Sequence, residues 1–406
     1  MDNSTVNKLQ ADTHQLTGEQ QSMIDGIKQF AIAHIHDSKP AVYVIYGDAG
    51  TGKSVILSQL FYDFQQMSAD SHGPLAGTKN YFLVNHPEIL KVYKQIAGHE
   101  ARVLKKNFNR PTSFINQMAK ADGHSDITLI DEAHLLLSKR DAYNKFRQDN
   151  QLAEIIKRSQ ITILVFDHRQ VLRTKSFWTV DRLKQLIAPY TVGEYHLKHQ
   201  FRMNASDGLV KWINTFTDGK LTPFPADIGK NYDFRLFDDA EEMRKQIVKR
   251  NQEVGLSRIV STTGYPSTLD GGKHYVVEGD FKLPWDQYNY TQTPWSELPS
   301  TINEVGSMYT CQGFDLNYVG VILGPPIKLD DDDNVYVDLS KLTDPESLKK
   351  RKDITDPKEF EQIKQTLVLN SVNVLMKRGV KGLYLFVHDP KLRVRLNQLW
   401  QQHQDA

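Results

Sequence analysis

The sequence predicts an α/β fold in which parallel sheets are flanked by helices. An apolar run at residues 41–46 suits a buried strand, and a glycine-rich loop and a helical pattern follow it directly. Two further apolar runs, at 127–130 and 161–166, each end in charged or amide side chains. Because ligands of an open parallel sheet lie beyond the carboxyl ends of its strands, these strand ends are the expected functional positions.

The loop after the first strand, residues 47–54, matches the phosphate-binding pattern G-x-x-x-x-G-K-[ST] at every fixed position. In this geometry the loop amides point at a phosphate, Lys53 reaches the outer phosphates and the Ser54 hydroxyl can bind Mg²⁺. A glycine-rich turn with a solvated lysine is the structural alternative. We expect nucleotide contacts along the whole loop, which comprises Gly47, Asp48, Ala49, Gly50, Thr51, Gly52, Lys53, Ser54 and Val55.

The composition, with 39% hydrophobic and 24% charged residues, is that of an ordinary globular protein, and 406 residues suffice for two or three domains. The net charge of +1 means that any surface for nucleic acid must be a local patch. The single cysteine, Cys311, excludes an intramolecular disulfide and a cysteine-rich zinc module. We expect a cytoplasmic protein without a membrane partner, since the sequence lacks a signal-peptide core and an apolar run of about 20 residues.

Upstream of the loop, residues 21–34 carry apolar side chains at helical spacing, and Thr17 suits the N-cap of this helix. Gln20 stands at the helix start. Its amide could pair with the edge of an adenine, although an ordinary surface glutamine is the simpler interpretation of this residue alone.

The second strand end delivers two adjacent carboxylates, Asp131 and Glu132. Asp131 can hold Mg²⁺, because this hard ion favours carboxylates and water. Glu132 is then placed to polarise an attacking water. Acidic pairs after apolar runs are common, so this pair is informative mainly because a phosphate loop precedes it. His134, two residues on, could contact a second domain, but a packing or capping histidine is the simpler interpretation.

The third strand end reads Asp-His-Arg-Gln at 167–170. Gln170 could sense the terminal phosphate of a nucleotide bound at the same edge of the sheet. A polar turn is the alternative.

Two arginines in the second half of the chain are candidates for stabilising transition-state charge on a γ-phosphate. Arg202 lies in the segment 194–203, which we expect to begin a new unit. Arg378 lies on a turn that leads into an apolar strand at 383–387. An isolated arginine on a strand is more often structural.

Residues 304–315 form another strong motif, followed by a strand at 318–323. Gln312 and Gly313 would close over a nucleotide or a strand of nucleic acid, and Asp315 could accept from a ribose hydroxyl. Cys311 has no histidine beside it in sequence, so we interpret it as a small packing residue.

Several other segments have simpler structural interpretations. Four aromatic residues of an irregular region near 264–300 could stack on bases, but local packing is the simpler interpretation; they are Trp285, Tyr288, Tyr290 and Trp295. The basic stretch 101–110 could contact phosphates, with a solvated helix face as the alternative. The acidic run 330–333 and the basic run 349–352 are most simply solvated parts of a loop.

Taken in this order, these residues resemble the core of superfamily 1 helicases, and most specifically the Schlafen group 3-like DNA/RNA helicase family of bacterial P-loop proteins. The resemblance extends over about residues 16–387. Its most specific parts are the segments 304–306, 310–315, 319–322, 374–379 and 381–384. The sequence departs from the family pattern at His134, at Asp315, where many relatives have glutamate, and before Asp167, where the usual glycine is missing.

The resemblance implies two tandem RecA-like P-loop NTPase domains, at 1–192 and 193–406, with ATP in the cleft between them and an irregular insertion near 264–300. It implies that Gln20 reads adenine, that the loop holds the phosphates, and that Asp131 and Glu132 serve metal and water. It also implies a group that couples hydrolysis to domain closure, made of Gln170, Arg202, Gln312 and Arg378.

We therefore expect an Mg²⁺-dependent ATPase that acts on single-stranded DNA or RNA as a helicase or translocase. ATP hydrolysis is the more secure expectation, because few segments could supply the insertions that separate strands. Two alternatives stay open. One is a nucleotide-gated switch module that works with a protein partner in a defence or regulatory complex. The other is a P-loop kinase, which would not need Gln312, Gly313 and Arg378.

Overall fold

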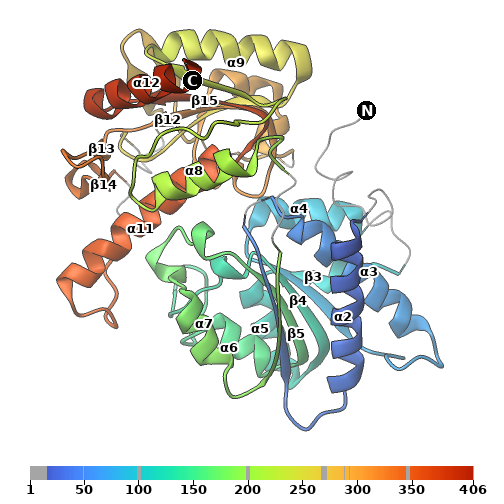
Figure 1. The fold of residues 1–406 in the computed structure, drawn as a ribbon. Coiled ribbons are helices and arrows are strands. Elements are labelled where there is room, and N and C mark those ends of the chain that lie inside the picture. Colours follow the sequence, from blue (N-terminus) through green and yellow to red (C-terminus); the bar gives the residue numbers. More distant parts are fainter. Residues whose placement is uncertain are drawn as a thin grey trace. The chain divides into compact units, whose positions relative to one another are not determined.

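The computed structural model describes residues 16–48, 50–97, 102–197, 202–266, 272–287, 289–291, 293–343 and 348–405 (Figure 1). Contacts divide the chain into two compact units. Unit 1 consists of Met1–Val171 and Lys175–Gln200, and unit 2 consists of Leu172–Thr174 and Phe201–Ala406.

Within the described residues, unit 1 contains a six-stranded sheet in the order β3-β2-β4-β5-β1-β6, and every pairing in it is parallel. All six residues of β1 are buried, as expected for a parallel strand that is covered on both faces. The strands are β1 (Ala41–Tyr46), β2 (Asn80–Val84), β3 (Phe108–Asn109), β4 (Ser125–Asp131), β5 (Ser159–Phe166) and β6 (Thr191–His196).

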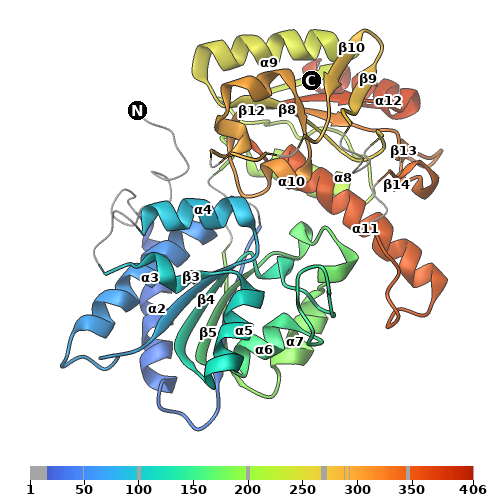
Figure 2. The same ribbon diagram turned by 180° about the vertical axis from the view of Figure 1, so that it is seen from behind.

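Helices cover both faces of this sheet (Figures 1 and 2). Helices α2 (Gly18–His34) and α3 (Lys53–Ala69) lie on one face, and α5 (Pro111–Ala121) and α6 (Gln151–Ile156) lie on the other. Unit 1 also contains α4 (Pro87–Ile96) and α7 (Val180–Ile187). Parallel strands joined by helices on both faces confirm the predicted α/β fold class.

Strand β6 differs from the expectation that a new unit begins at Glu194. This residue lies within β6, which pairs with β1 from Thr191 to His196, so the expected limit after residue 192 also falls inside a strand of the first sheet. The residues of β6 are half-buried or exposed. The strand therefore lacks the continuous apolar run by which the buried strands were recognised.

The basic stretch before α5 is not a helix face in its described part, residues 102–110. It forms a short 3₁₀ turn, Lys105–Asn107, and then edge strand β3. Phe108 is buried, and its ring centroid lies 5.1 Å from that of Phe61 and 5.3 Å from that of Phe82. This stretch therefore combines a buried aromatic residue with strand pairing to β2.

Within the described residues, unit 2 contains a five-stranded parallel sheet in the order β11-β8-β12-β15-β7. Its strands are β7 (Asp233–Phe237), β8 (Ser257–Ser261), β11 (Val305–Gly306), β12 (Leu316–Leu323) and β15 (Gly379–Val387). Its helices are α8 (Asp207–Thr217), α9 (Ala240–Val254), α10 (Met308–Cys311), α11 (Pro357–Met376) and α12 (Pro390–Gln404). Two antiparallel pairs accompany the sheet, β9 (Tyr275–Glu278) with β10 (Phe281–Pro284) and β13 (Ile327–Leu329) with β14 (Val335–Val337).

Strand β12 separates two apolar clusters. Val319 and Val321 belong to the cluster that includes residues of α8, α11 and α12, whereas Ile322 belongs to the cluster of α9 and the β9–β10 pair. This follows from the strand geometry, because successive side chains point to opposite faces of the sheet.

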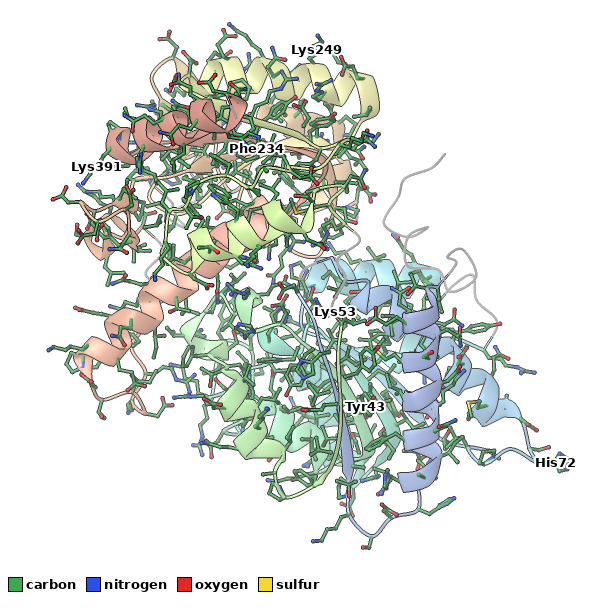
Figure 3. The ribbon with its side chains drawn as sticks, in the orientation of Figure 1. Tyr43, Lys53, His72, Phe234, Lys249 and Lys391 are labelled. Atoms are coloured by element: carbon green, nitrogen blue, oxygen red, sulfur yellow. The ribbon has the colours of Figure 1, made fainter. Side chains whose placement is uncertain are left out.

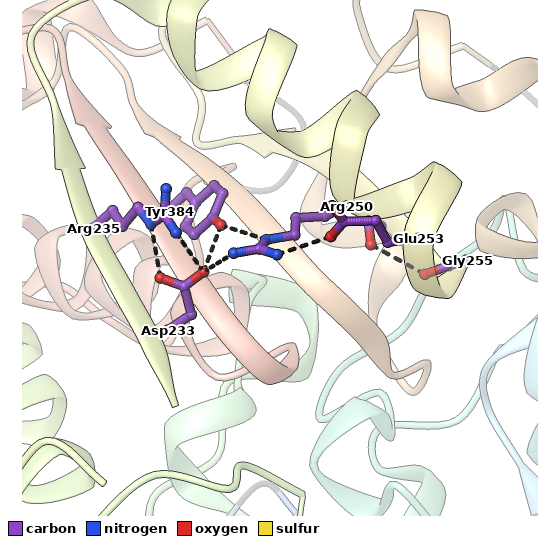
Figure 4. Close-up of polar contacts among 7 residues, drawn as sticks. Asp233, Arg235, Arg250, Glu253, Gly255 and Tyr384 are labelled. Carbon is purple, nitrogen blue, oxygen red and sulfur yellow. Dashed lines mark hydrogen bonds and ion pairs between the residues drawn. The ribbon is translucent and has the colours of Figure 1, made fainter. Parts of the chain in front are cut away.

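A polar network ties α9 to the sheet of unit 2 (Figure 4). Arg235 on β7 and Arg250 on α9 both pair with Asp233, at 2.8 Å and 2.7 Å. The Tyr384 hydroxyl of β15 donates to the same carboxylate at 2.6 Å. The network therefore joins three separate elements.

Two expectations about the charged and aromatic segments of unit 2 can be compared with the structure. Trp285 and Trp295 are buried, which confirms packing over base stacking for these two; Tyr290 is exposed and Tyr288 lies outside the described residues.

The basic run 349–352 is not wholly solvated. Arg351 is 2% exposed, and its guanidinium donates to the Thr174 carbonyl at 2.7 Å and pairs with Asp353 at 2.8 Å. A carbonyl and a carboxylate together satisfy this buried cation.

In the part of the chain that the structure describes, no helix is both long and apolar enough to span a membrane.

Candidate nucleotide site

The phosphate loop follows β1, and α3 begins at its lysine (Figure 3). Gly50 and Gly52 have φ angles of 86° and 81°, in the left-handed region that favours glycine. A Cβ atom on Gly47 would lie 2.7 Å from Thr51 Oγ1, so side chains are excluded here as well. Lys53 Nζ donates to the carbonyl oxygens of Gly47 and Asp48, at 2.8 Å and 2.5 Å. The lysine amine therefore lies over the loop.

Of the other loop positions, Thr51 Oγ1 donates to the Asp48 carbonyl at 3.0 Å, and Val55 lies in the first turn of α3. Ala49 lies outside the described residues.

Gln20 is buried and borders the loop, so the structure does not support the surface interpretation. Its Nε2 would lie 2.7 Å from a Cβ on Gly52. Its Oε1 accepts from the Thr17 backbone at 3.0 Å, and Thr17 Oγ1 accepts from the Gln20 backbone at 3.2 Å. This capping box fixes the side chain of Gln20 at the start of α2, next to the loop.

Ser54 and Asp131, the two expected metal ligands, lie close together, with Asp131 buried and Ser54 half-buried. The Tyr93 hydroxyl of α4 donates to Asp131 Oδ2 at 2.7 Å, and the Ser54 hydroxyl lies near the same carboxylate. Burial raises the pKa of Asp131 to about 6 and the Glu132 carboxylate adds to this rise, while the two hydroxyls oppose it. A hydroxyl and a carboxylate are ligands that suit Mg²⁺, which takes its remaining ligands from water and phosphates.

Glu132 has an unusual backbone. Its φ and ψ angles, 52° and 47°, lie in the left-handed region, which is costly for a residue with a Cβ and is often found at functional sites. Its Oε2 lies 3.0 Å from Nε2 of the fully buried His134. His134 is therefore a packed histidine within unit 1, and it contacts the Glu132 side chain.

Asp167 connects Gln170 to the phosphate loop. Gln170 Nε2 donates to Asp167 Oδ2 at 2.7 Å, and Lys53 Nζ lies 3.6 Å from the same oxygen. All three side chains are buried. The Asp167 carboxylate thus lies next to both Lys53 and Gln170 and connects these two side chains.

Unit 1 therefore gathers its candidate residues at the carboxyl ends of three adjacent strands, β4, β5 and β1. Within the described residues, no group of three or more His, Cys, Asp or Glu side chains could hold a metal ion alone.

The candidates of unit 2 form a second group. Arg202 pairs with the Asp315 carboxylate. Gln312 is buried, and Gly313 has a φ angle of 85° in the turn before β12. The Asp315 carboxylate is therefore the ion-pair partner of Arg202 in this structure.

Arg378 lies in the interior of unit 2, with 1% of its surface exposed. Its Nε donates to the Val374 carbonyl at 2.9 Å, and one terminal nitrogen lies 3.3 Å from the Phe314 carbonyl. Cys311 is buried in the adjoining core, where burial raises the pKa of its thiol to about 11. Its interpretation as a packing residue is thereby confirmed.

Two residues with clear contacts to the site, Tyr93 and Asp167, were given no role from the sequence, and both hold expected residues. His134 was expected to pack, to cap or to contact a second domain, and its contact with Glu132 was not foreseen. Asp167 had a usable signal, because it follows a buried strand at the same edge of the sheet. Tyr93 had none, since only the packing of α4 brings it to Asp131.

Comparisons with known proteins agree with these observations. The chain is 39% identical to an uncharacterized Saccharomyces cerevisiae protein, YPL245W, over 96% of this chain and 92% of the yeast protein. The resemblance had suggested a bacterial family, but this relative comes from yeast.

Solved structures are less similar. The Pif1 helicase of Candida albicans matches 96% of this chain and 99% of its own, with 11% identity and a TM-score of 0.37. AMPPCP-bound DnaA of Aquifex aeolicus matches 48% of this chain and 51% of its own, with 15% identity and a TM-score of 0.27.

A family model described as "Schlafen group 3, DNA/RNA helicase domain" matches residues 40–389, which include every candidate residue except Gln20. The chain therefore belongs to the Schlafen group 3 DNA/RNA helicase domain family.

Proposed function

We propose that this protein is an Mg²⁺-dependent ATPase that acts on single-stranded DNA or RNA as a helicase or translocase. Membership of a helicase domain family supports a nucleotide-hydrolysing, helicase-like role. The observation that supports hydrolysis most directly is that Lys53 lies over the phosphate loop, while Asp131 and Glu132 are buried at the end of the nearby strand β4.

In this proposal the loop amides and Lys53 bind the phosphates of ATP, and Gln20 reads the adenine edge. Ser54 and Asp131 would hold Mg²⁺, which would neutralise charge that develops on the phosphates. Their hydroxyl and carboxylate oxygens fit this ion.

Glu132 polarises the attacking water, and His134 orients its carboxylate. Gln170 senses the terminal phosphate through Asp167. Both proposals rest on the contacts of these side chains within unit 1.

We also propose that the two units are tandem RecA-like domains and that unit 2 couples hydrolysis to domain closure. Arg202 and Arg378 would stabilise charge on the γ-phosphate, and Gln312 and Gly313 would close over the nucleotide or the strand. Arg202 is the better first candidate, because its 15% exposed side chain is held by a carboxylate, whereas Arg378 is held in the interior by backbone carbonyls.

The test is steady-state ATP hydrolysis with Mg²⁺, with and without single-stranded DNA and RNA. Lys53→Ala should abolish hydrolysis, whereas Lys120→Ala, an exposed lysine of α5, should retain it. Stimulation by one polymer would identify the strand, and a duplex with a labelled strand would then test unwinding.

Other outcomes favour the alternatives. Hydrolysis that depends on Lys53 but ignores both polymers would favour the nucleotide-gated switch with a protein partner. A phosphorylated product in place of free phosphate would favour the kinase.

A further inference from the structure

Unit 1 presents an exposed aromatic side chain at the tip of a closed loop. Tyr143 is 91% exposed and lies between Glu132 and α6 along the chain. The loop is closed at its base, where Gln151 N donates to the Leu137 carbonyl at 2.9 Å and Leu137 N donates to Gln151 Oε1 at 2.8 Å. Compact loops with joined ends are frequently functional.

The tip itself is held by hydrogen bonds. Asp141 and Phe146 form an antiparallel bridge with two backbone hydrogen bonds of 3.0 Å. The Asp141 carboxylate accepts from the Tyr143 backbone at 3.1 Å and from Asn144 Nδ2 at 2.8 Å. Phe146 is buried, which anchors the turn in unit 1. The turn is thus fixed, while the Tyr143 ring contributes almost nothing to packing.

The charge of this loop is positive. Four cations and two carboxylates lie between residues 139 and 149, so this segment exceeds the net charge of the whole chain, +1. One carboxylate, Asp141, is buried and lies 3.1 Å from Lys175 outside the segment. The other, Asp149, pairs with Arg140 at 2.8 Å, and both side chains are mostly exposed, so this pair exchanges easily with other ions. Lys145 and Arg147 are exposed on either side of Phe146.

We propose that this loop, residues 139–147, is a contact site for single-stranded nucleic acid, in which a base stacks on Tyr143 and phosphates pair with Lys145 and Arg147. A single strand fits because its bases offer free faces to an aromatic ring, and such stacking beside cations is how strands are bound without sequence preference. The proposal rests on the nucleic-acid partner of the proposed function. With a net charge of only +1, the chain would need a local basic patch to bind nucleic acid, and this loop is such a patch.

The first test is binding of fluorescent oligothymidylate and oligouridylate, measured by anisotropy. Tyr143→Ala should raise Kd roughly 5- to 100-fold, because the stacked base loses its platform. Tyr143→Phe should bind as the wild type does, since the ring and not the hydroxyl carries the contact. Tyr336→Ala is the control, because Tyr336 of β14 is also exposed, at 38%, but follows the acidic run 330–333 in sequence.

The second test is the salt dependence of binding. The double variant Lys145→Gln, Arg147→Gln should lower the slope of log K against log salt by about 1.4, at roughly 0.7 for each phosphate contact on a single strand. The double variant Lys120→Gln, Lys184→Gln removes two exposed lysines elsewhere in unit 1 and should leave the slope unchanged.

The proposal is overturned if Tyr143→Ala binds with the wild-type Kd, if Tyr336→Ala loses as much, or if the wild type binds neither polymer. An equal loss in the Ala and Phe variants would also contradict stacking. Melting temperatures of all variants check that the fold is intact. Hydrolysis that depends on Lys53 would survive each of these outcomes, so a failure here is distinguishable from a failure of the ATPase proposal.

Discussion

The candidate residues of unit 1 lie at the carboxyl ends of its strands, whereas those of unit 2 lie at the amino ends. In unit 1, Gly47 follows β1, Asp131 ends β4 and Asp167 follows β5. In unit 2, Asp315 precedes β12 and Arg378 precedes β15. The candidate functional groups of a parallel sheet can thus lie at the carboxyl ends or at the amino ends of its strands. The motif, rather than the fold class, decides which ends are used.

Two carboxylates of unit 1 and one arginine of unit 2 differ in how they are held. Asp131 and Glu132 contact other side chains, those of Tyr93 and His134. In unit 2, Arg378 is held by backbone carbonyls of the interior. A substitution at Asp131 or Glu132 should therefore change chemistry more than stability, and a substitution at Arg378 should change both.

The largest effect on kcat with nucleotide binding retained is expected from Glu132→Gln. Loss of the carboxylate should lower kcat about 10²- to 10⁴-fold while nucleotide binding is retained. Rapid-quench hydrolysis and titration with a fluorescent nucleotide would separate the two quantities. A variant that hydrolyses ATP at the full rate would assign the base to another residue.

Arg378→Ala should give the largest effect on stability. Two buried carbonyl oxygens would lose a charged donor, which should lower the free energy of unfolding by about 2–4 kcal/mol. Arg202→Ala should cost only about 1 kcal/mol, because its partly exposed partner Asp315 can be solvated. Urea denaturation measures both, and equal losses would contradict the distinction between the two arginines.

Stability should also depend on pH through Asp131. Its pKa is raised by burial to about 6 in the folded protein, above the ordinary value of 3.8. The folded state therefore binds the proton more tightly, so its stability falls as pH rises from about 4 to about 6 and is level above that range. Asp131→Asn should remove this decline, which urea denaturation across the range would detect. A parallel pH profile in the variant would contradict the assignment.

The smallest expected effect is that of Gln20→Ala. Loss of one hydrogen-bonding amide should raise the KM for ATP roughly fivefold and leave the KM for GTP unchanged, since one such bond contributes about 1 kcal/mol. Gln21→Ala, the exposed neighbour, is the control. Equal changes for both nucleotides would argue against adenine recognition and for a structural role in the capping box.

The sequence predicted those features that contiguous residues encode. The strand, loop and helix around Lys53 could be recognised because one short segment contains the pattern and its context. The α/β fold class and the helicase family were likewise predicted and are confirmed. The roles of the individual site residues stay predictions, to be tested as described above.

Other features depend on contacts between distant segments, which no local pattern contains. Strand β6 was expected to open the second unit, but it belongs to the first sheet. Its half-buried and exposed residues gave no sign of this, because its place is set by pairing with β1 and not by its own composition. Arg351 was assigned to a solvated run, but it is buried and contacts Thr174, which is far away in sequence.

By itself, the sequence determined the parallel fold, the position of the phosphate loop and the order of the motifs, because strand, turn and helix signals are local in the chain. Only the tertiary structure decided that Tyr93 holds Asp131, that His134 contacts Glu132 and that Arg378 belongs to the interior. The physical reason is that burial and hydrogen-bond partners are set by packing between elements, and packing joins residues that are far apart in sequence.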